Sequence, residues 1–457
     1  MSDTASSPSA TVSGPPRTLR FPGFIDERPL GGFQLRTTLL CGLVMLLDGF
    51  DTQAINYMAP AITRDWGVSK GTMATVFSAA LVGLMLGYLL LAPLADRLGH
   101  KRLVMAGVAL FSLSTLASVW VQSPDQLIIM RFITGMGLGA ATPSTIALTA
   151  EYSPKRLRAS LVLAIYCGFS LGFVAANYTA GWLIPAYGWR SVFIAGAVLP
   201  LALLPILAWR LPESISYLLH RGDHTKAYSL TRSIDRTLPE TGQAQLEAES
   251  AEPGKRVKVT ELLSGRQLLG TVLLWGVFAI NLAMFYGLQS WMPTILSERG
   301  YSAGTLATAA SMTTIGGIVI AFVVGPAMDR LGAYSSLSAL YFVGCGFLIL
   351  MSLVLGSPVW MVLAAIFLIG CTVSGGQKSV IALAAAFYPE EVRATGLGWA
   401  LGIGRVGGIL GPVIVGGLLA GGIGHERLFM ILVIPTALCG LIVLYLGRRA
   451  KQQLKVV

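Results

Sequence analysis

The chain has 457 residues, of which 54% are hydrophobic and only 12% are charged, and its mean hydropathy is +0.69. This composition excludes a soluble globular domain of this size and is typical of a protein with many membrane-spanning segments. The net charge of +11 would suggest a nucleic-acid partner for a soluble protein. Here the basic residues lie in alternate loops between apolar runs, so we predict no nucleic-acid partner.

Apolar segments of about 20 residues follow one another without the period-two alternation of a membrane β-barrel. We therefore predict an all-α membrane protein with twelve transmembrane helices. The expected segments lie near residues 37–61, 74–95, 103–122, 126–150, 159–183, 192–211, 268–295, 304–328, 335–355, 359–388, 394–420 and 428–447.

The only long polar loop follows the sixth segment and divides the chain into two halves. This predicts a tail over 1–36, a six-helix bundle over 37–211, a central loop over 212–267, a second bundle over 268–447 and a tail over 448–457. The first tail has no apolar stretch followed by a small-residue cleavage site, so we do not expect a signal peptide. The distribution of Lys and Arg places both termini and the central loop in the cytoplasm.

The first segment carries two acids, Asp48 and Asp51, within an otherwise apolar run. An Asp near a bilayer centre costs on the order of 3 kcal/mol by insertion scales, so it indicates a functional site that faces a cavity or a cation. The two acids share one helix face with Thr52 and Asn56. Neighbouring carboxylates in a low dielectric cannot both ionise easily, which predicts a proton site. The alternative is that ion pairs hold both acids in a purely structural role.

A loop motif and a second loop recur in the two halves. Asp96-Arg97-Leu98-Gly99 after the second segment returns as Asp329-Arg330-Leu331-Gly332 after the eighth, and Arg158-Ala159-Ser160 returns as Arg393-Ala394-Thr395. Transporters built from repeated halves bind substrate between the halves and rock one against the other. We interpret Asp96 and Asp329 as conformational latches and assign Arg97, Gly99 and Arg393 to the same gating function. Ordinary anchoring to the cytoplasmic membrane surface is the alternative.

Several of these motifs resemble those of the major facilitator superfamily. The loop from Gly87 to Lys101 is similar to its signature between the second and third helices, and Arg131-Phe132-Ile133-Thr134-Gly135 is similar to its fourth-helix motif. The Asp-Gly-x-Asp of the first helix, Glu151-Tyr152, and the stretch from Tyr388 through Trp399 resemble the aromatic acid:proton symporters. This resemblance implies two pseudo-symmetric six-helix bundles and uptake of benzoate, hydroxybenzoates or protocatechuate with protons.

The resemblance also implies roles for two residues of the fourth segment. Arg131 is expected to balance charge near the proton site, and Glu151 to act in gating or in the proton path. Each has a simpler alternative. Arg131 lies near the start of its helix, so its side chain could reach the membrane surface, and Glu151 could form a surface ion pair with Arg158.

Arg405 is the strongest candidate for a substrate ligand. It lies mid-helix among glycines with no acid nearby in sequence, and a guanidinium presents two parallel donors that match a carboxylate. A structural pair with Asp48 or Asp51 is the competing interpretation. Lys378 is either a second anion contact, which would favour a dicarboxylate, or a partner of a first-helix Asp.

The seventh segment combines aromatic and hydrogen-bonding side chains, as a pocket for an aromatic ligand requires. These side chains are Asn281, Tyr286, Gln289 and Trp291. Together with Asn56 we assign them to the substrate site, although a Trp near a helix end is as often an interfacial anchor.

The sequence therefore predicts a monomeric, proton-coupled importer of small aromatic carboxylates that spans the lipid bilayer of a cell inner membrane. Import of muconate or another dicarboxylate is the closest alternative, and a sensor that binds the acid without moving it is a more distant one. Five scattered cysteines show no metal-ligand spacing, and no nucleophile with a paired base appears. We expect no enzyme activity, no metal and no cofactor.

Overall fold

The structure is a computed structural model that describes residues 19–21, 23–26, 28–235, 237–238, 246–248, 262–263, 268–388 and 390–454. The side chains of residues 19–20, 159, 246–248, 329, 385–386, 390–395 and 451–454 lie outside this description. Within these ranges, twelve helices are long and apolar enough to cross a membrane, which confirms the predicted fold class.

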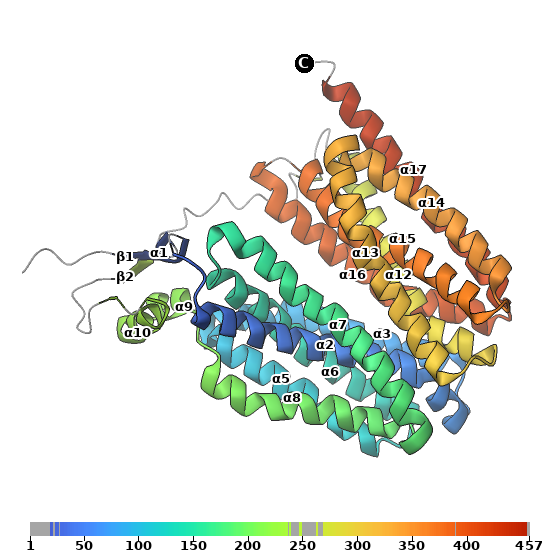
Figure 1. The fold of residues 1–457 in the computed structure, drawn as a ribbon, viewed down its shortest axis with the longest axis horizontal. Coiled ribbons are helices and arrows are strands. Elements are labelled where there is room, and N and C mark those ends of the chain that lie inside the picture. The colour runs from blue at the N-terminus through green and yellow to red at the C-terminus, as the bar shows by residue number, and fades with distance from the viewer. Residues whose placement is uncertain are drawn as a thin grey trace, which may run out of the picture.

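The helices follow one another along the chain with short connections, apart from the long segment between α8 and α12 (Figure 1). Those of the first half are α2 (Gly32–Trp66), α3 (Lys70–Leu86) continued by η1 (Gly87–Leu91), η2 (Ala92–Leu94) and α4 (Ala95–Leu98), α5 (His100–Ala117) with η3 (Ser118–Trp120), α6 (Pro124–Glu151), α7 (Lys155–Tyr187) and α8 (Arg190–Arg210). Those of the second half are α12 (Leu268–Glu298), α13 (Ala303–Leu331), α14 (Ala333–Val354), α15 (Val359–Phe387), α16 (Glu390–Ala420) and α17 (His425–Leu454).

The first membrane helix starts earlier than the apolar run predicts. The side chain of Gln34 accepts a hydrogen bond of 2.7 Å from the amide of Gly31, which satisfies a backbone donor at the helix start. At the other end, Gly67 has a φ of 61°, a left-handed conformation that terminates the helix. Capping therefore extends α2 beyond the predicted 37–61 in both directions.

Short elements form a cap on the face of the molecule where α2 begins and α8 ends. They are α1 (Gly23–Asp26), α9 (Ile215–His220), α10 (His224–Ile234), and the strands β1 (Leu19–Phe21) and β2 (Leu246–Ala248), which pair in parallel with Leu19 opposite Leu246. We predicted only a tail and a polar loop here, because these elements are too short and too polar to give an apolar signal.

Hydrogen bonds and ion pairs fasten the cap to the first half of the chain. Glu213 accepts from the amide of Lys101 at 2.9 Å, and Arg28 forms an ion pair of 2.7 Å with Asp235. Hydrogen bonds from Thr237 and the ion pair with Arg28 lower the pKa of Asp235, so this carboxylate stays charged at neutral pH.

The two halves lie side by side and meet at the face that carries the α2–α3 and α12–α13 connections. In the part of the chain that the structure describes, six hydrogen bonds join them, and α3 packs on α16, α7 on α13 and α2 on α12. The bonded pairs are Tyr57–Ala303, Lys70–Glu298, Ser78–Ile409, Asn177–Ser311, Gln53–Gln289 and Tyr88–Arg405. The ribbons of the halves separate toward the cap and the C-terminus (Figure 1).

Gly49, between the two aspartates, is required by the close approach of α2 and α7. A Cβ at this position would lie 2.0 Å from the carbonyl oxygen of Phe169. We expect Gly49→Ala to cost about 1–3 kcal/mol of stability, because the backbone of α7 must shift. Gly42→Ala is the matched control on the same helix, since its Cβ would meet only the side chain of Ile165 at 3.8 Å. Thermal unfolding in detergent compares the two, and equal midpoints would contradict the expectation.

Candidate functional site

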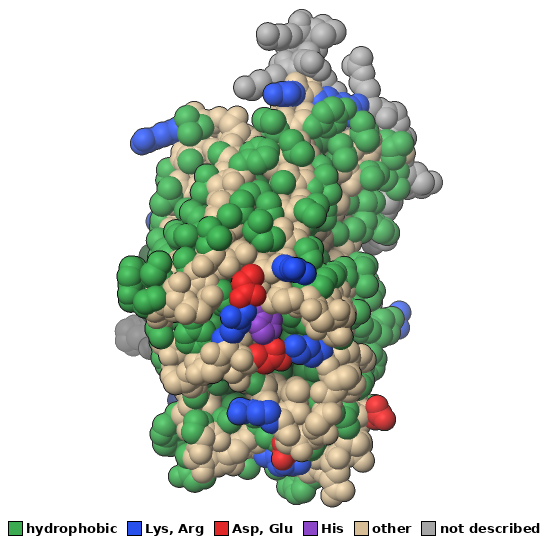
Figure 2. All heavy atoms as spheres, turned by 90° about the vertical axis from the view of Figure 1, so that its right-hand side faces the viewer, with side chains coloured by type: hydrophobic (Ala, Val, Ile, Leu, Met, Phe, Trp, Pro, Cys, Tyr) green, Lys and Arg blue, Asp and Glu red, His purple; other side chains and the backbone are tan. Residues whose placement is uncertain are grey.

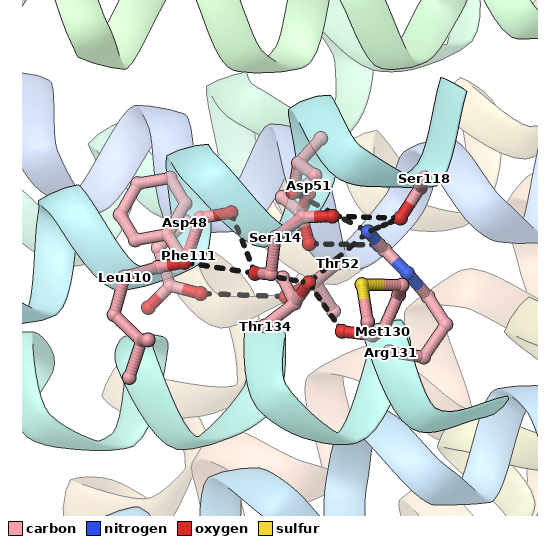
Figure 3. A network of polar contacts seen from close by, with 11 residues as sticks. Asp48, Asp51, Thr52, Leu110, Phe111, Ser114, Ser118, Met130, Arg131 and Thr134 are labelled. Atoms are coloured by element: carbon pink, nitrogen blue, oxygen red, sulfur yellow. Dashed lines mark hydrogen bonds and ion pairs between the residues drawn. The ribbon is translucent and has the colours of Figure 1, made fainter. Parts of the chain in front are cut away.

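Asp51 and Arg131 form a buried ion pair in the middle of the first bundle (Figure 3). Nη1 of Arg131 lies 3.2 Å from Oδ2 of Asp51, and both side chains are at most 4% exposed. Thr115 of α5 donates a hydrogen bond of 2.7 Å to the other carboxylate oxygen. The pair therefore joins α2, α5 and α6.

The surroundings of Arg131 exclude the interpretation that its side chain reaches the membrane surface. Nη2 donates to the hydroxyls of Thr115, Ser118 and Thr134 at 3.2–3.4 Å, and the guanidinium lies 5.0 Å from the ring centroid of Phe193. The predicted placement of this cation next to a first-helix carboxylate is what the structure has.

Asp48 is also buried, but it has a different kind of partner. Its carboxylate accepts hydrogen bonds from Thr142 at 2.7 Å and from Thr52 at 3.3 Å. Among the described residues no basic group lies within 4.0 Å of it. The positive charge that acts on Asp48 is that of Arg405, across the boundary between the halves.

Arg405 of α16 lies at this boundary and contacts tyrosines from both sides. Nη1 donates to the hydroxyl of Tyr286 at 3.3 Å, and Nη2 to the hydroxyl of Tyr88 at 3.4 Å. The guanidinium also lies 5.1 Å from the ring centroid of Tyr88. Within the described residues it forms no ion pair with a carboxylate, so the predicted structural pair with Asp48 or Asp51 is absent from this conformation.

Amide side chains from both halves form a chain of buried hydrogen bonds. Gln53 accepts from Asn56 at 3.0 Å and from Gln289 at 3.1 Å, and it donates to Asn177 at 2.9 Å. Asn177 in turn donates to Ser311 at 3.3 Å. The predicted residues Asn56 and Gln289 therefore lie together, on the side of Asp51 that faces the α2–α3 connection.

A small cavity of about 30 Å³ connects several of these groups. Asp51, Asn56, Arg131, Tyr286 and Gln289 line it. Its volume is far below the several hundred Å³ of a typical ligand pocket, so an aromatic acid does not fit there in this conformation.

Two predicted pocket residues of α12 do not line this cavity. Trp291 is 1% exposed, donates to the carbonyl of Pro412 at 2.9 Å and packs edge-on against Phe77. Asn281 is buried inside the second bundle, where it donates to Tyr341 at 3.1 Å. In this conformation Trp291 seals the contact between the halves and Asn281 braces the second bundle, and their assignment to the substrate site stays a prediction.

Lys378 of α15 is exposed, and its ammonium group donates to the carbonyl of Gly317 at 3.4 Å. Among the described residues, Lys378 forms no ion pair with a carboxylate. Lys378 therefore does not pair with a first-helix Asp in this conformation.

The loop motif adopts the same backbone in both halves. Gly99 has a φ of 96° and Gly332 a φ of 87°, a region that favours glycine. Asp96 is exposed and has no hydrogen-bond partner among the described residues, and Arg97 meets Tyr217 through its carbonyl oxygen. The expected latch at Asp96 is therefore not engaged here. The side chains of Asp329 and Arg393 lie outside the described part, so their roles stay predictions.

Glu151 lies at the cap and not in a surface ion pair with Arg158. Its carboxylate accepts a hydrogen bond of 2.8 Å from the amide of Ser216, in the first turn of α9. Arg158 pairs instead with Asp26 at 3.3 Å. Glu151 thus links the end of α6 to the cap, and its role in a proton path stays a prediction.

Comparison with known proteins decides the family. The sequence profile of the Major Facilitator Superfamily matches residues 41–355 and 339–456. The 4-hydroxybenzoate transporter PcaK of Pseudomonas aeruginosa is 38% identical to this chain, covering 93% of it and 95% of the relative. The gallate transporter of Pseudomonas putida is 37% identical, covering 93% and 94%. The chain belongs to the aromatic-acid transporters of the major facilitator superfamily.

Two further similarities are consistent with this assignment. The benzoate transport protein of Acinetobacter baylyi is 30% identical to the transporter, covering 92% of it and 91% of the relative. The inward-open structure of the xylose transporter XylE from Escherichia coli superposes with a TM-score of 0.68 at 16% identity, covering 90% of this chain and 95% of that one. At this identity the XylE structure confirms the fold alone.

Several polar partners of the charged groups in the transporter site were not predicted from the sequence, among them Tyr88, Thr115 and Thr142. Tyr88 binds Arg405, Thr115 binds Asp51 and Thr142 binds Asp48. A Thr inside a membrane helix gives little signal, because its hydroxyl commonly bonds a carbonyl of its own helix, as Thr142 also does with Leu138. Tyr88 could have been found from its place in an apolar run, just before the loop motif.

Proposed function

We propose that this transporter imports small aromatic carboxylates, such as hydroxybenzoates, together with protons by alternating access. The named substrates of its relatives support the substrate class. The charges of Asp48 and Arg405, neither of which has an ion-pair partner among the described residues, support the coupling to protons. We further propose that it works as a monomer in a cell inner membrane, with both termini and the cap in the cytoplasm.

The observation that carries the proposal is the environment of Arg405. A cation inside the membrane normally has an acidic partner, yet this guanidinium bonds only tyrosine hydroxyls among the described residues. A substrate carboxylate can accept both Nη donors in place of the hydroxyls, as a bidentate pair. The rings of Tyr88 and Tyr286 would then border an aromatic substrate.

Asp48 is the proposed proton site, and Asp51 is not. The charge of Asp51 is already balanced by Arg131, whereas Asp48 has only hydroxyl donors at hydrogen-bond distance. While Asp48 is ionised it attracts Arg405. When it accepts a proton, that attraction ends and Arg405 is free to bind the substrate anion.

This arrangement couples the two ligands thermodynamically. If protonation of Asp48 raises the affinity of Arg405 for a carboxylate, bound carboxylate must raise proton affinity by the same factor. Protons imported in excess of the substrate charge then drive accumulation, at about 2.3 kcal/mol per charge per 100 mV.

The described conformation is proposed to face the cytoplasm. Of its six hydrogen bonds between the halves, all but Tyr88–Arg405 lie toward the α2–α3 and α12–α13 connections, which the proposed topology places outside. The ion pair of 3.0 Å between Lys70 and Glu298 closes that face, where Figure 2 shows acidic, basic and histidine side chains gathered together. The unengaged Asp96 at the opposite face agrees with an open cytoplasmic side.

Lys378 favours a second candidate, import of a dicarboxylate. Its ammonium group is exposed and has only one long contact, with a backbone carbonyl, so it is available to a second acidic group or to a ring hydroxyl. Competition between labelled 4-hydroxybenzoate and unlabelled benzoates or muconate separates the two candidates. Stronger competition by muconate would favour the dicarboxylate.

The decisive test is uptake of labelled 4-hydroxybenzoate into proteoliposomes under an inward proton gradient, with and without a protonophore. We expect protonophore-sensitive accumulation by the native chain. Arg405→Lys keeps the charge but loses the bidentate geometry, so we expect the KM to rise at least tenfold. Arg427→Lys, at an exposed position of the same half, is the control.

The alternatives give different results. Equilibration without accumulation would show a facilitator without proton coupling. Binding without any movement would show a sensor. An unchanged KM for Arg405→Lys would remove Arg405 from the substrate site.

A further inference from the structure

A basic recess lies beneath the cap, at the ends of α2, α5 and α8. It has a volume of about 290 Å³, and its charged lining residues are Arg36, Lys101, Arg210, Lys226 and Glu213. Glu213 is the acid among them, and one of its oxygens already accepts the amides of Lys101 and Ser214. The recess therefore carries an excess of positive charge.

Its arginines offer donors that the protein does not use. The guanidinium of Arg36 lies 5.0 Å from the ring centroid of Phe33, and its buried Nε has no hydrogen-bond partner in the structure. Arg210 lies 3.8 Å above the ring of Trp209. Neither arginine forms an ion pair among the described residues. Because a buried unpaired donor is costly, Arg36 indicates an anionic ligand with an acceptor oxygen at this point.

The recess lies at the depth of lipid headgroups. Trp209 is 77% exposed at the end of the membrane span of α8, a position typical of the membrane interface. On α2, Leu39 and Leu43 are 61% and 43% exposed and follow Arg36 at helical spacing. An apolar track thus leads from the bilayer to the basic recess, as a ligand with both a charged head and acyl chains requires.

We propose that this recess binds the phosphodiester headgroup of one anionic phospholipid, with its acyl chains along Leu39 and Leu43 of α2. Arg36 and Arg210 donate to the phosphate oxygens, and Lys101 adds charge from α5. Lys226 of α10 contributes little, because it already forms an ion pair of 2.7 Å with Asp223. The bound lipid joins the cap to the membrane surface. This inference rests on the recess alone and holds whatever substrate the transporter carries.

Native mass spectrometry of the full chain in detergent tests the site, with phosphatidylglycerol, phosphatidylcholine and inorganic phosphate as separate probes. We expect one phosphatidylglycerol to bind with higher affinity than phosphatidylcholine. The variant Arg36→Gln/Arg210→Gln should lower the affinity for phosphatidylglycerol about thirtyfold, since it removes two basic residues that each contribute on the order of 1 kcal/mol near the surface. Arg156→Gln/Arg448→Gln removes the same charge from exposed positions elsewhere on the cap face and should leave binding unchanged.

Three outcomes would overturn the proposal. Equal losses in the two double variants would show nonspecific attraction to surface charge. Equal affinities for phosphatidylglycerol and phosphatidylcholine would show that the site does not distinguish lipids by the charge of the headgroup. Binding of inorganic phosphate that displaces the lipid at micromolar concentration would show a site for a soluble anion. Thermal unfolding of both variants must match the native chain, and if it does not, Arg36→Lys/Arg210→Lys replaces the first variant, with a smaller loss expected.

Discussion

Asp48→Asn is expected to abolish proton-driven accumulation of aromatic acid while exchange of substrate across the membrane continues. The amide preserves the shape of the side chain but cannot take up or release a proton. Arg405 then faces a neutral side chain at position 48 at all times, so it can still bind the substrate. The halves can still rock, but transport is no longer coupled to the proton gradient. The accumulation ratio in proteoliposomes should fall to one, insensitive to protonophore.

Counterflow distinguishes this outcome from simple inactivation. Vesicles loaded with unlabelled 4-hydroxybenzoate should still take up labelled substrate through Asp48→Asn. Asp125→Asn, at an exposed position at the start of α6, is the control and should accumulate substrate normally. Protonophore-sensitive accumulation by Asp48→Asn at the native level would assign the coupling proton to another group.

Removal of one partner of the buried ion pair is expected to destabilise the first bundle severely. Arg131→Met leaves Asp51 charged and buried with Thr115 as its remaining hydrogen-bond donor, and such a change typically costs about 3–5 kcal/mol. The double variant Asp51→Asn/Arg131→Met removes both charges and should recover most of this loss. Denaturant unfolding in detergent compares the native chain with Arg131→Met, Asp51→Asn and the double variant.

The comparison of these four proteins also yields the coupling energy of the pair. A value near zero would mean that Arg131 and Asp51 act independently, contrary to the 3.2 Å contact. If the double variant is stable yet transports nothing, the pair contributes to coupling as well as to stability. If it transports normally, its role is structural and the coupling proton belongs to Asp48.

Sequence reasoning found the charged groups of the site because a charge within an apolar helix stands out. Asp48, Asp51 and Arg405 stand out in this way, whereas the role of Arg131 is implied by the family resemblance. The partners were harder to assign, since Asp51 and Arg131 are 80 residues apart and the pairing depends on how α2 packs against α6. Residue type alone could not decide whether the Arg131 side chain reaches the membrane surface or lies in the protein interior.

The fold was predictable because apolar runs of membrane length stand out from the polar loops between them. Twelve apolar runs of membrane length leave few alternatives to a helical bundle, and the repeated loops indicate how it is divided. Helix ends were less predictable because capping contacts, such as that of Gln34 with Gly31, extend helices into polar sequence. The role of Trp291 could not be decided from its residue type, because an aromatic ring serves equally well in a pocket and in a sealed contact.

Within the described residues the cap is attached to the first half, and this has a consequence for measurements of the transport cycle. Glu151, Glu213 and Arg28 connect it to helices or loops of the first half, so α9 and α10 must travel with that half as one body. The distance between a spin label on α10 and one at the start of α14 would then depend on how the two halves are oriented. The change in their distance distribution between substrate-free and substrate-bound samples would report the relative tilt of the two bundles directly.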